Sequence, residues 1–123
     1  MNFKKSNKLL ESYKKMIPGT KIFNNFDPFE QKQTPFCIEK GKDSFVWDLD
    51  GNKYLDFHMS LGSVILGYAN KNVNNSAIKQ LKNGMTFSLM NELENTVAAQ
   101  LINMIPSAEM VRFGKNGSDV LAA

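Results

Sequence analysis

The amino-acid sequence predicts an α/β fold, in which an N-terminal helix and a small antiparallel sheet precede the start of a larger α/β domain. Two observations support this prediction. The tripeptide Asp50-Gly51-Asn52 separates two runs rich in aromatic and apolar residues, which is a strong signal for a β-hairpin. After it come two amphipathic segments, an apolar run at 110–113 and a glycine turn. This order of helix, helix, strand and helix is typical of a domain with a mainly parallel sheet.

The first sixteen residues predict a basic amphipathic helix. Apolar side chains recur on one face of residues 1–16, and Pro18-Gly19 would end the helix. A helix packed at the edge of a domain is the simpler interpretation, although a helix on a membrane surface or against a partner has the same pattern. Residues 24–34 are polar and contain proline, so we expect a loop there.

Three strands are expected in the next part of the chain. Residues 36–40 predict the first strand, and residues 45–49 and 53–57 predict the two strands of the hairpin. Asp48 and Asp56 could be paired catalytic carboxylates, but their place beside the turn favours polar residues at the edge of the sheet. The sequence therefore predicts a small antiparallel sheet without a catalytic pair.

The middle of the chain predicts a loop followed by two helices. Residues 59–68 are apolar with two glycines, which is typical of a tight loop over a buried surface. Residues 72–83 predict a helix with Gly84 as its C-cap. Asn91 and Glu94 have the spacing of a capping box and would start a second helix that extends to Met104. A domain boundary near 62–71 divides the chain into segments 1–66 and 67–123.

Composition narrows the classes of function. The chain of 123 residues has fifteen Lys or Arg and twelve Asp or Glu, for a formal charge of +3. Basic residues are scattered, and Arg112 is the sole arginine, so a nucleic-acid binder is not favoured. One cysteine, Cys37, is typical of a reducing cytoplasm. The sequence contains no apolar run of the roughly twenty residues that span a bilayer, and its first residues do not resemble a signal peptide.

The end of the chain predicts a phosphate site. Residues 110–113 favour a strand, residues 114–117 a turn, and Ser118 or Asp119 a helix N-cap. The N–H groups of a helix's first turn carry partial positive charge and bind phosphate, which Gly117 would allow to approach and Ser118 would contact. A hairpin turn at Asn116-Gly117 or a turn without a ligand has the same signal. A nucleotide P-loop fits worse, because Lys115 precedes the second glycine.

Other chemistry is not favoured by the residue types present. Cys37 and His58 are the only Cys and His, and nothing in their spacing orients a third group for a thiol-imidazole pair. A zinc site would need three or four clustered ligands, which the sequence does not offer. We therefore expect no metal ion.

Several segments resemble one family in the same order and at similar spacing. They are Ile17-Pro18-Gly19, Val46-Trp47-Asp48-Leu49-Asp50-Gly51-Asn52-Lys53-Tyr54-Leu55-Asp56-Phe57, Leu66-Gly67-Tyr68, Glu92-Leu93-Glu94 and Val111-Arg112-Phe113-Gly114-Lys115-Asn116-Gly117-Ser118-Asp119. This series is similar to the class III aminotransferases, specifically the branch containing glutamate-1-semialdehyde 2,1-aminomutase. The resemblance implies the amino-terminal portion of a pyridoxal-phosphate-dependent transferase of fold type I. The family's enzymes are several times longer, so the chain is interpreted as an amino-terminal fragment.

The resemblance implies pyridoxal 5'-phosphate (PLP) as the cofactor of the complete enzyme. By position, the resemblance implies that Gly117, Ser118 and Asp119 bind the cofactor. Gly117 and Ser118 match family residues that contact the cofactor phosphate, and Asp119 replaces the Glu of many members. Lys115 does not match the lysine that forms the Schiff base, which lies beyond Ala123 in the family. We therefore predict no catalytic residue in this chain and no aminotransferase activity from it alone.

The resemblance also implies a cytoplasmic homodimer that acts on small amino-group donors and acceptors, without nucleic acid or membrane. Either transamination between substrates or amino transfer within one substrate is compatible with it. The chain departs from the family at residues 20–23 and at Tyr68, where the family usually has His. An alternative of another class is a non-catalytic small domain that binds a phosphate compound or a protein partner.

Overall fold

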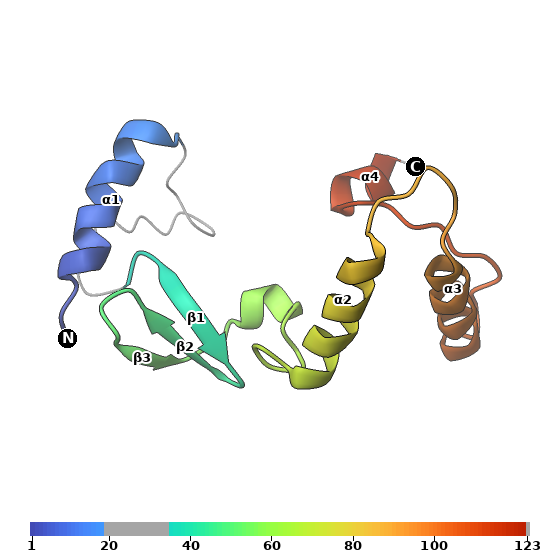
Figure 1. Ribbon diagram of the computed structural model, residues 1–123, viewed down its shortest axis with the longest axis horizontal. Coiled ribbons are helices and arrows are strands. Elements are labelled where there is room, and N and C mark those ends of the chain that lie inside the picture. The colour runs from blue at the N-terminus through green and yellow to red at the C-terminus, as the bar shows by residue number, and fades with distance from the viewer. Residues whose placement is uncertain (19–34, 123) are drawn as a thin grey trace. The chain divides into compact units, whose positions relative to one another are not determined.

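A computed structural model describes residues 1–18 and 35–122 of the chain. The loop expected at 24–34 and the departure at 20–23 lie outside the described residues. The chain forms two compact units, Met1–Ile78 and Lys79–Ala123, which are considered separately below. In chain order, the elements are α1 (Lys4–Met16), β1 (Ile38–Lys42), β2 (Phe45–Asp48), β3 (Lys53–Leu55), the 3-10 helix η1 (Met59–Gly62), α2 (Lys71–Asn83), α3 (Glu92–Met104) and α4 (Gly117–Ala122) (Figure 1).

The three strands form an antiparallel sheet in the order β1-β2-β3, as the hairpin signal predicts. Trp47 in β2 pairs with Lys40 on one side and with Lys53 on the other. The ammonium group of Lys53 lies 3.7 Å from the ring centre of Phe45, a cation–π distance that supports the pairing of β2 with β3. The first strand begins at Ile38 rather than at residue 36.

Asp48 organises the hairpin turn from inside. Its side chain is fully buried, so the expectation of a polar residue at the sheet edge is wrong for this position. The carboxylate accepts hydrogen bonds from the backbone N–H groups of Asp50 and Asn52 at 3.0 and 2.8 Å, and from the hydroxyl of Tyr54 at 2.8 Å. Burial is tolerated because these donors replace the water that a carboxylate would otherwise bind.

A second aspartate, Asp50, attaches α1 to the sheet. The N-cap residue of α1, Phe3, offers no side-chain acceptor, and the first turn contains no acidic residue. Instead, the two carboxylate oxygens of Asp50 accept the backbone N–H groups of Lys5 and Ser6, each at 2.9 Å. The cap of this helix is therefore supplied by a residue more than forty positions away.

The apolar loop predicted at 59–68 contains η1 and an unusual run of backbone angles. Met59, Ser60 and Leu61 have φ angles of 47°, 48° and 58°, and Gly62 follows at 90°. Residues other than glycine rarely adopt backbone angles in this left-handed region. The loop is therefore tighter than its glycine content alone predicts.

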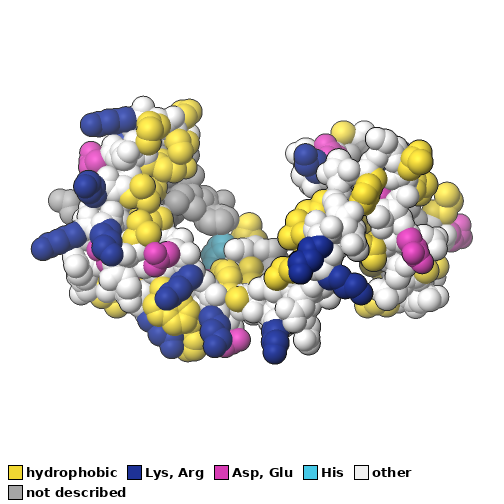
Figure 2. All heavy atoms as spheres, in the orientation of Figure 1, with side chains coloured by type: hydrophobic (Ala, Val, Ile, Leu, Met, Phe, Trp, Pro, Cys, Tyr) yellow, Lys and Arg dark blue, Asp and Glu magenta, His cyan; other side chains and the backbone are white. Residues whose placement is uncertain are grey.

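The two predicted helices are present as α2 and α3. Gly84 follows α2 with a φ of 101°, which confirms its role as a C-cap. Asn91 and Glu94 form the predicted capping box of α3, with the Asn91 Oδ1 accepting the N–H of Leu93 at 2.9 Å. Neither helix buries a described residue, and hydrophobic side chains reach the surface in Figure 2. None of the helices described here has the length and hydrophobicity needed to cross a bilayer.

The strand predicted at 110–113 is wrong: these residues have no regular secondary structure. A parallel strand forms only against a neighbouring strand. In the described part of the chain, the three paired strands all lie between Ile38 and Leu55, and none lies in the unit that contains residues 110–113. The apolar run therefore lacks the partner that would stabilise it as a strand.

Candidate phosphate-binding site

The candidate site is the turn that leads into α4. Its N-cap is Asn116, and the expectation that Ser118 or Asp119 caps the helix is wrong. The Oδ1 of Asn116 accepts the backbone N–H of Asp119 at 3.0 Å, and its carbonyl oxygen accepts the N–H of Val120 at 3.2 Å. The signal was present in the sequence, because Asn116 and Asp119 have the spacing of a capping-box pair.

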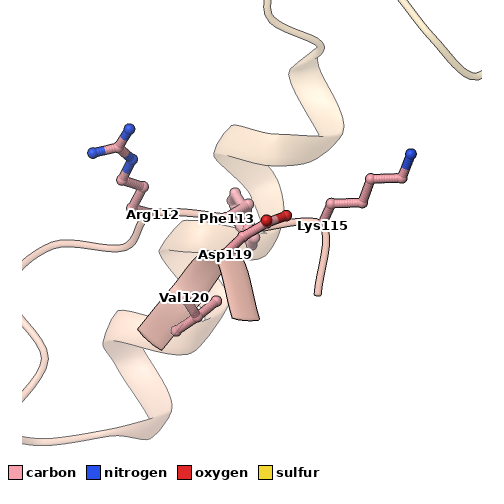
Figure 3. A pocket seen from close by; sticks show the side chains of 6 residues that line it. Arg112, Phe113, Lys115, Asp119 and Val120 are labelled. Atoms are coloured by element: carbon pink, nitrogen blue, oxygen red, sulfur yellow. The ribbon is translucent and has the colours of Figure 1, made fainter. Parts of the chain in front are cut away.

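A shallow pocket of about 440 Å³ lies beside this turn. Its charged side chains are two cations and one carboxylate, those of Arg112, Lys115 and Asp119. In Figure 3, Arg112 and Lys115 point in opposite directions, on either side of Asp119. Both side chains raise the local positive potential. Because they diverge, they do not hold a ligand between them. Of these three residues, the sequence interpretation assigned a binding role only to Asp119.

The two glycines of the turn have different physical roles. A Cβ added to Gly114 would lie 2.7 Å from the Cγ2 of Val120, so this glycine allows the turn to pack closely on α4. A Cβ added to Gly117 would meet no heavy atom within 4 Å. Gly117 is thus not required by packing within the described structure. The space around its backbone is open to a ligand.

The structure brings Gly117, Ser118 and Asp119 together in the first turn of α4. The first N–H groups of a helix have no acceptor within the helix. Asn116 takes the N–H of Asp119, so those of Gly117 and Ser118 are available at the start of the helix. Two adjacent N–H groups, a serine hydroxyl and open space at Gly117 are the donor set and access that a phosphate group requires. This donor set is of the kind that binds a phosphate group.

Cys37 and His58 show no arrangement for nucleophilic chemistry. Burial raises the pKa of the Cys37 thiol, and the carboxylates of Asp48 and Asp50 add to the effect. A thiol with a raised pKa is a poor nucleophile. Among residues 1–18 and 35–122, no three His, Cys, Asp or Glu side chains gather to hold a metal ion.

Comparison with known proteins gives consistent matches. Residues 27–122 match the family described as aminotransferase class-III. A glutamate-1-semialdehyde 2,1-aminomutase from Methanococcus maripaludis strain C5 is 37% identical over 117 residues, which are 94% of this chain and 26% of that protein. A 3-aminobutyryl-CoA aminotransferase from Cloacimonas acidaminovorans is 38% identical over 120 residues, 94% of this chain and 28% of that protein.

Solved structures agree on the fold. The FumI protein of Sphingopyxis sp. MTA144, solved in a form with PLP, superposes with a TM-score of 0.86 at 24% identity, over 97% of this chain and 29% of that chain. The chain thus spans between a quarter and a third of the length of these proteins.

Proposed function

The chain belongs to the class III aminotransferase family, and from this premise we propose that it supplies the cofactor-phosphate anchor of a PLP-dependent aminotransferase or aminomutase. The predicted resemblance to the glutamate-1-semialdehyde 2,1-aminomutase branch is confirmed by the matching relatives, and PLP is the cofactor of the family. The observation that carries the proposal is the open first turn of α4, where Gly117 and Ser118 present adjacent donors.

Each residue of the turn has a distinct part in this proposal. The N–H groups of Gly117 and Ser118 and the Ser118 hydroxyl donate to the phosphate oxygens, and Asn116 keeps the helix start ordered by accepting from Asp119. Arg112 and Lys115 add positive potential beside the phosphate. When bound, PLP supplies the electron sink for bonds to the amino-bearing carbon. The resemblance places the Schiff-base lysine of the family beyond the position of Ala123, so no residue of this turn is proposed to form the Schiff base.

The test is a titration with pyridoxamine 5'-phosphate, which carries the phosphate but lacks the aldehyde that would react with the chain's lysines. We expect the amide resonances of Gly117 and Ser118 to shift on titration, and pyridoxamine without phosphate to leave them unchanged. Ser118→Ala should weaken the response about tenfold, because it removes a hydroxyl donor to a charged group. Ser107→Ala, the same substitution outside α4, is the matched control.

A response to inorganic phosphate equal to that with pyridoxamine 5'-phosphate would instead favour the second candidate, a non-catalytic domain that binds phosphate compounds. No response at Gly117 or Ser118 to either ligand would overturn the phosphate anchor.

The remaining features of the protein are proposed from the family. We infer a cytoplasmic homodimer that uses small amino-group donors and acceptors. Transfer between two substrates and transfer within one are both represented among the relatives, by an aminotransferase and by an aminomutase.

A further inference from the structure

The loop between β3 and α2 has a conformation that needs an external constraint. It spans residues 57–67, and four consecutive residues from Met59 to Gly62 have positive φ angles. Three of these four are not glycine, so each has a Cβ that disfavours this backbone conformation. The loop also exposes apolar side chains: Leu61 is 74% exposed and Ile65 is 77% exposed. Neither its local sequence nor packing of these side chains accounts for the conformation.

One carboxylate contacts both ends of this loop. At the start of the loop, Asp56 Oδ1 accepts the backbone N–H groups of His58 at 2.9 Å and Met59 at 3.2 Å. At the end of the loop, Asp56 Oδ2 accepts the hydroxyl of Tyr68 at 2.6 Å. A charged acceptor makes each of these bonds stronger than a bond between neutral groups. Asp56 therefore connects two chain positions twelve residues apart.

Tyr68 is itself held by β1 and the residue after it. Its backbone N–H and carbonyl pair with Asp43 at 2.8 and 2.9 Å. Its ring lies against Gly41, where an added Cβ would approach the ring Cδ1 to 2.6 Å. The tyrosine ring is thus fixed against the sheet before its hydroxyl reaches Asp56. This arrangement sets the distance between the loop's two ends.

We propose that Asp56 and Tyr68 form a clasp that closes the loop of residues 57–67 and holds its left-handed stretch, Met59–Gly62, and that opening of the Tyr68–Asp56 hydrogen bond releases the loop as a unit. The two ionisation equilibria agree with a closed clasp. The hydrogen bond from Tyr68 lowers the pKa of Asp56, and the same bond raises the pKa of Tyr68. This device is independent of the cofactor proposal, because it lies in the unit Met1–Ile78 and uses none of the phosphate-site residues.

The test is amide hydrogen exchange in the Tyr68→Phe variant. This substitution keeps the ring against Gly41 and removes only the hydroxyl. We expect exchange at the amides of His58 and Met59 to become about tenfold faster, because local opening of the loop no longer breaks a charge-assisted bond. Tyr54→Phe is the matched control, since it removes the same kind of bond, to Asp48, outside the loop. It should leave exchange at His58 and Met59 unchanged.

A second variant separates the clasp from general stability. Asp56→Asn keeps an acceptor at Oδ1 and replaces the charged Oδ2. The double variant Tyr68→Phe with Asp56→Ala removes the acceptor and the hydroxyl together. Asp56→Asn should therefore accelerate exchange at His58 and Met59 by less than the double variant. Unchanged exchange in Tyr68→Phe would overturn the clasp. The proposal would fail equally if the variant accelerated the amides of Val46 and Tyr54 in the sheet as much as those of the loop, because the bond would then support the whole unit.

Discussion

Different kinds of interaction stabilise the inside of each of the two compact units. In Met1–Ile78, the described residues include four buried ones, Ser6, Leu10, Val46 and Asp48, and its hydrogen bonds join positions as far apart as Asn2 and Asn52. In Lys79–Ala123, no described residue is buried, and the side-chain hydrogen bonds described there join residues at most four positions apart.

This difference shows that a helix in this chain can be well capped without being buried by tertiary packing. The second unit has complete local signals, including a capping box and a C-cap glycine, yet Leu93 is 49% exposed and Val97 is 41% exposed on α3. The first unit also has a local cap, Asn70 at the start of α2, but it attaches α1 to the sheet through the distant Asp50. Loss of a long-range bond should therefore mainly affect the first unit, and loss of the Asn91 cap should mainly affect the second.

Acid should remove the largest part of the first unit's stability. Burial raises the pKa of Asp48 and Asp50, but the hydrogen bonds that each carboxylate accepts outweigh burial and lower the pKa overall. The pKa of Asp56 is also lowered, mainly by the hydrogen bond from Tyr68. Carboxylates with depressed folded-state pKa values stabilise the fold above their ordinary value of about 3.8. That stability is lost as pH falls through the depressed values. We expect cooperative unfolding below pH 3.8, followed through the fluorescence of Trp47, the sole tryptophan.

At alkaline pH, stability should be lost as the pH rises rather than as it falls. Burial and the bond to Asp48 raise the pKa of Tyr54 to about 12 from 10.0. The stabilisation is fully present below pH 10.0 and is lost as pH rises through about 12. If the fluorescence of Trp47 showed no unfolding at either acid or alkaline pH, the result would contradict a fold stabilised by buried carboxylates.

Asp48→Ala should have the largest effect of any single substitution. It leaves the N–H groups of Asp50 and Asn52 and the hydroxyl of Tyr54 without their buried acceptor, at a cost of about 3 kcal/mol in the free energy of unfolding. Urea unfolding monitored by Trp47 fluorescence measures it. Glu109→Ala, a substitution of an exposed acid in the second unit, is the control and should leave the midpoint unchanged.

Gly41→Ala should cost about 2 kcal/mol, because the new methyl group would overlap the ring of Tyr68. Gly117→Ala is its counterpart in the second unit, where a Cβ would meet open space. Its effect on stability should stay within about 0.5 kcal/mol. Thermal unfolding of the two variants compares them directly, and equal losses would argue against the close approach of Tyr68 to β1.

Asn91→Ala should have the smallest and most local effect. It removes the side-chain acceptor that caps α3 and should destabilise that helix by about 1 kcal/mol. Far-UV circular dichroism should report lost helix while the fluorescence of Trp47 stays unchanged. Asn103→Ala places the same substitution in the last turn of α3, where alanine is the better helix former, so it should not reduce helicity. A change in Trp47 fluorescence in Asn91→Ala would show that the units are not independent.

Local signals in the sequence predicted most of the elements. The turn at 50–52, the capping pair Asn91 and Glu94, and Gly84 all appear as expected, because each acts on its neighbours in the chain. The cap of α4 was misassigned from the same kind of signal. Asn116, Ser118 and Asp119 are all good N-caps, and only the bond to Asp119 distinguishes them.

The roles of the aspartates depended on tertiary contacts. The residue types of Asp48, Asp50 and Asp56 are those of exposed turns, but the structure makes the first a buried acceptor and the second the cap of α1. The apolar run at 110–113 failed as a strand for the related reason that a strand requires a pairing partner.

By itself, the sequence determined the family of this chain, its hairpin, its three longer helices and the choice of Gly117 and Ser118 as the proposed phosphate anchor, since these depend on residue type and short spacing. The tertiary structure alone decided which carboxylates are buried, which helix start each one caps, and that Asp56 joins both ends of a left-handed loop. The physical reason is distance along the chain. Hydrogen bonds between residues twelve to fifty positions apart form only after folding has brought their groups together, and no local pattern in the sequence records them.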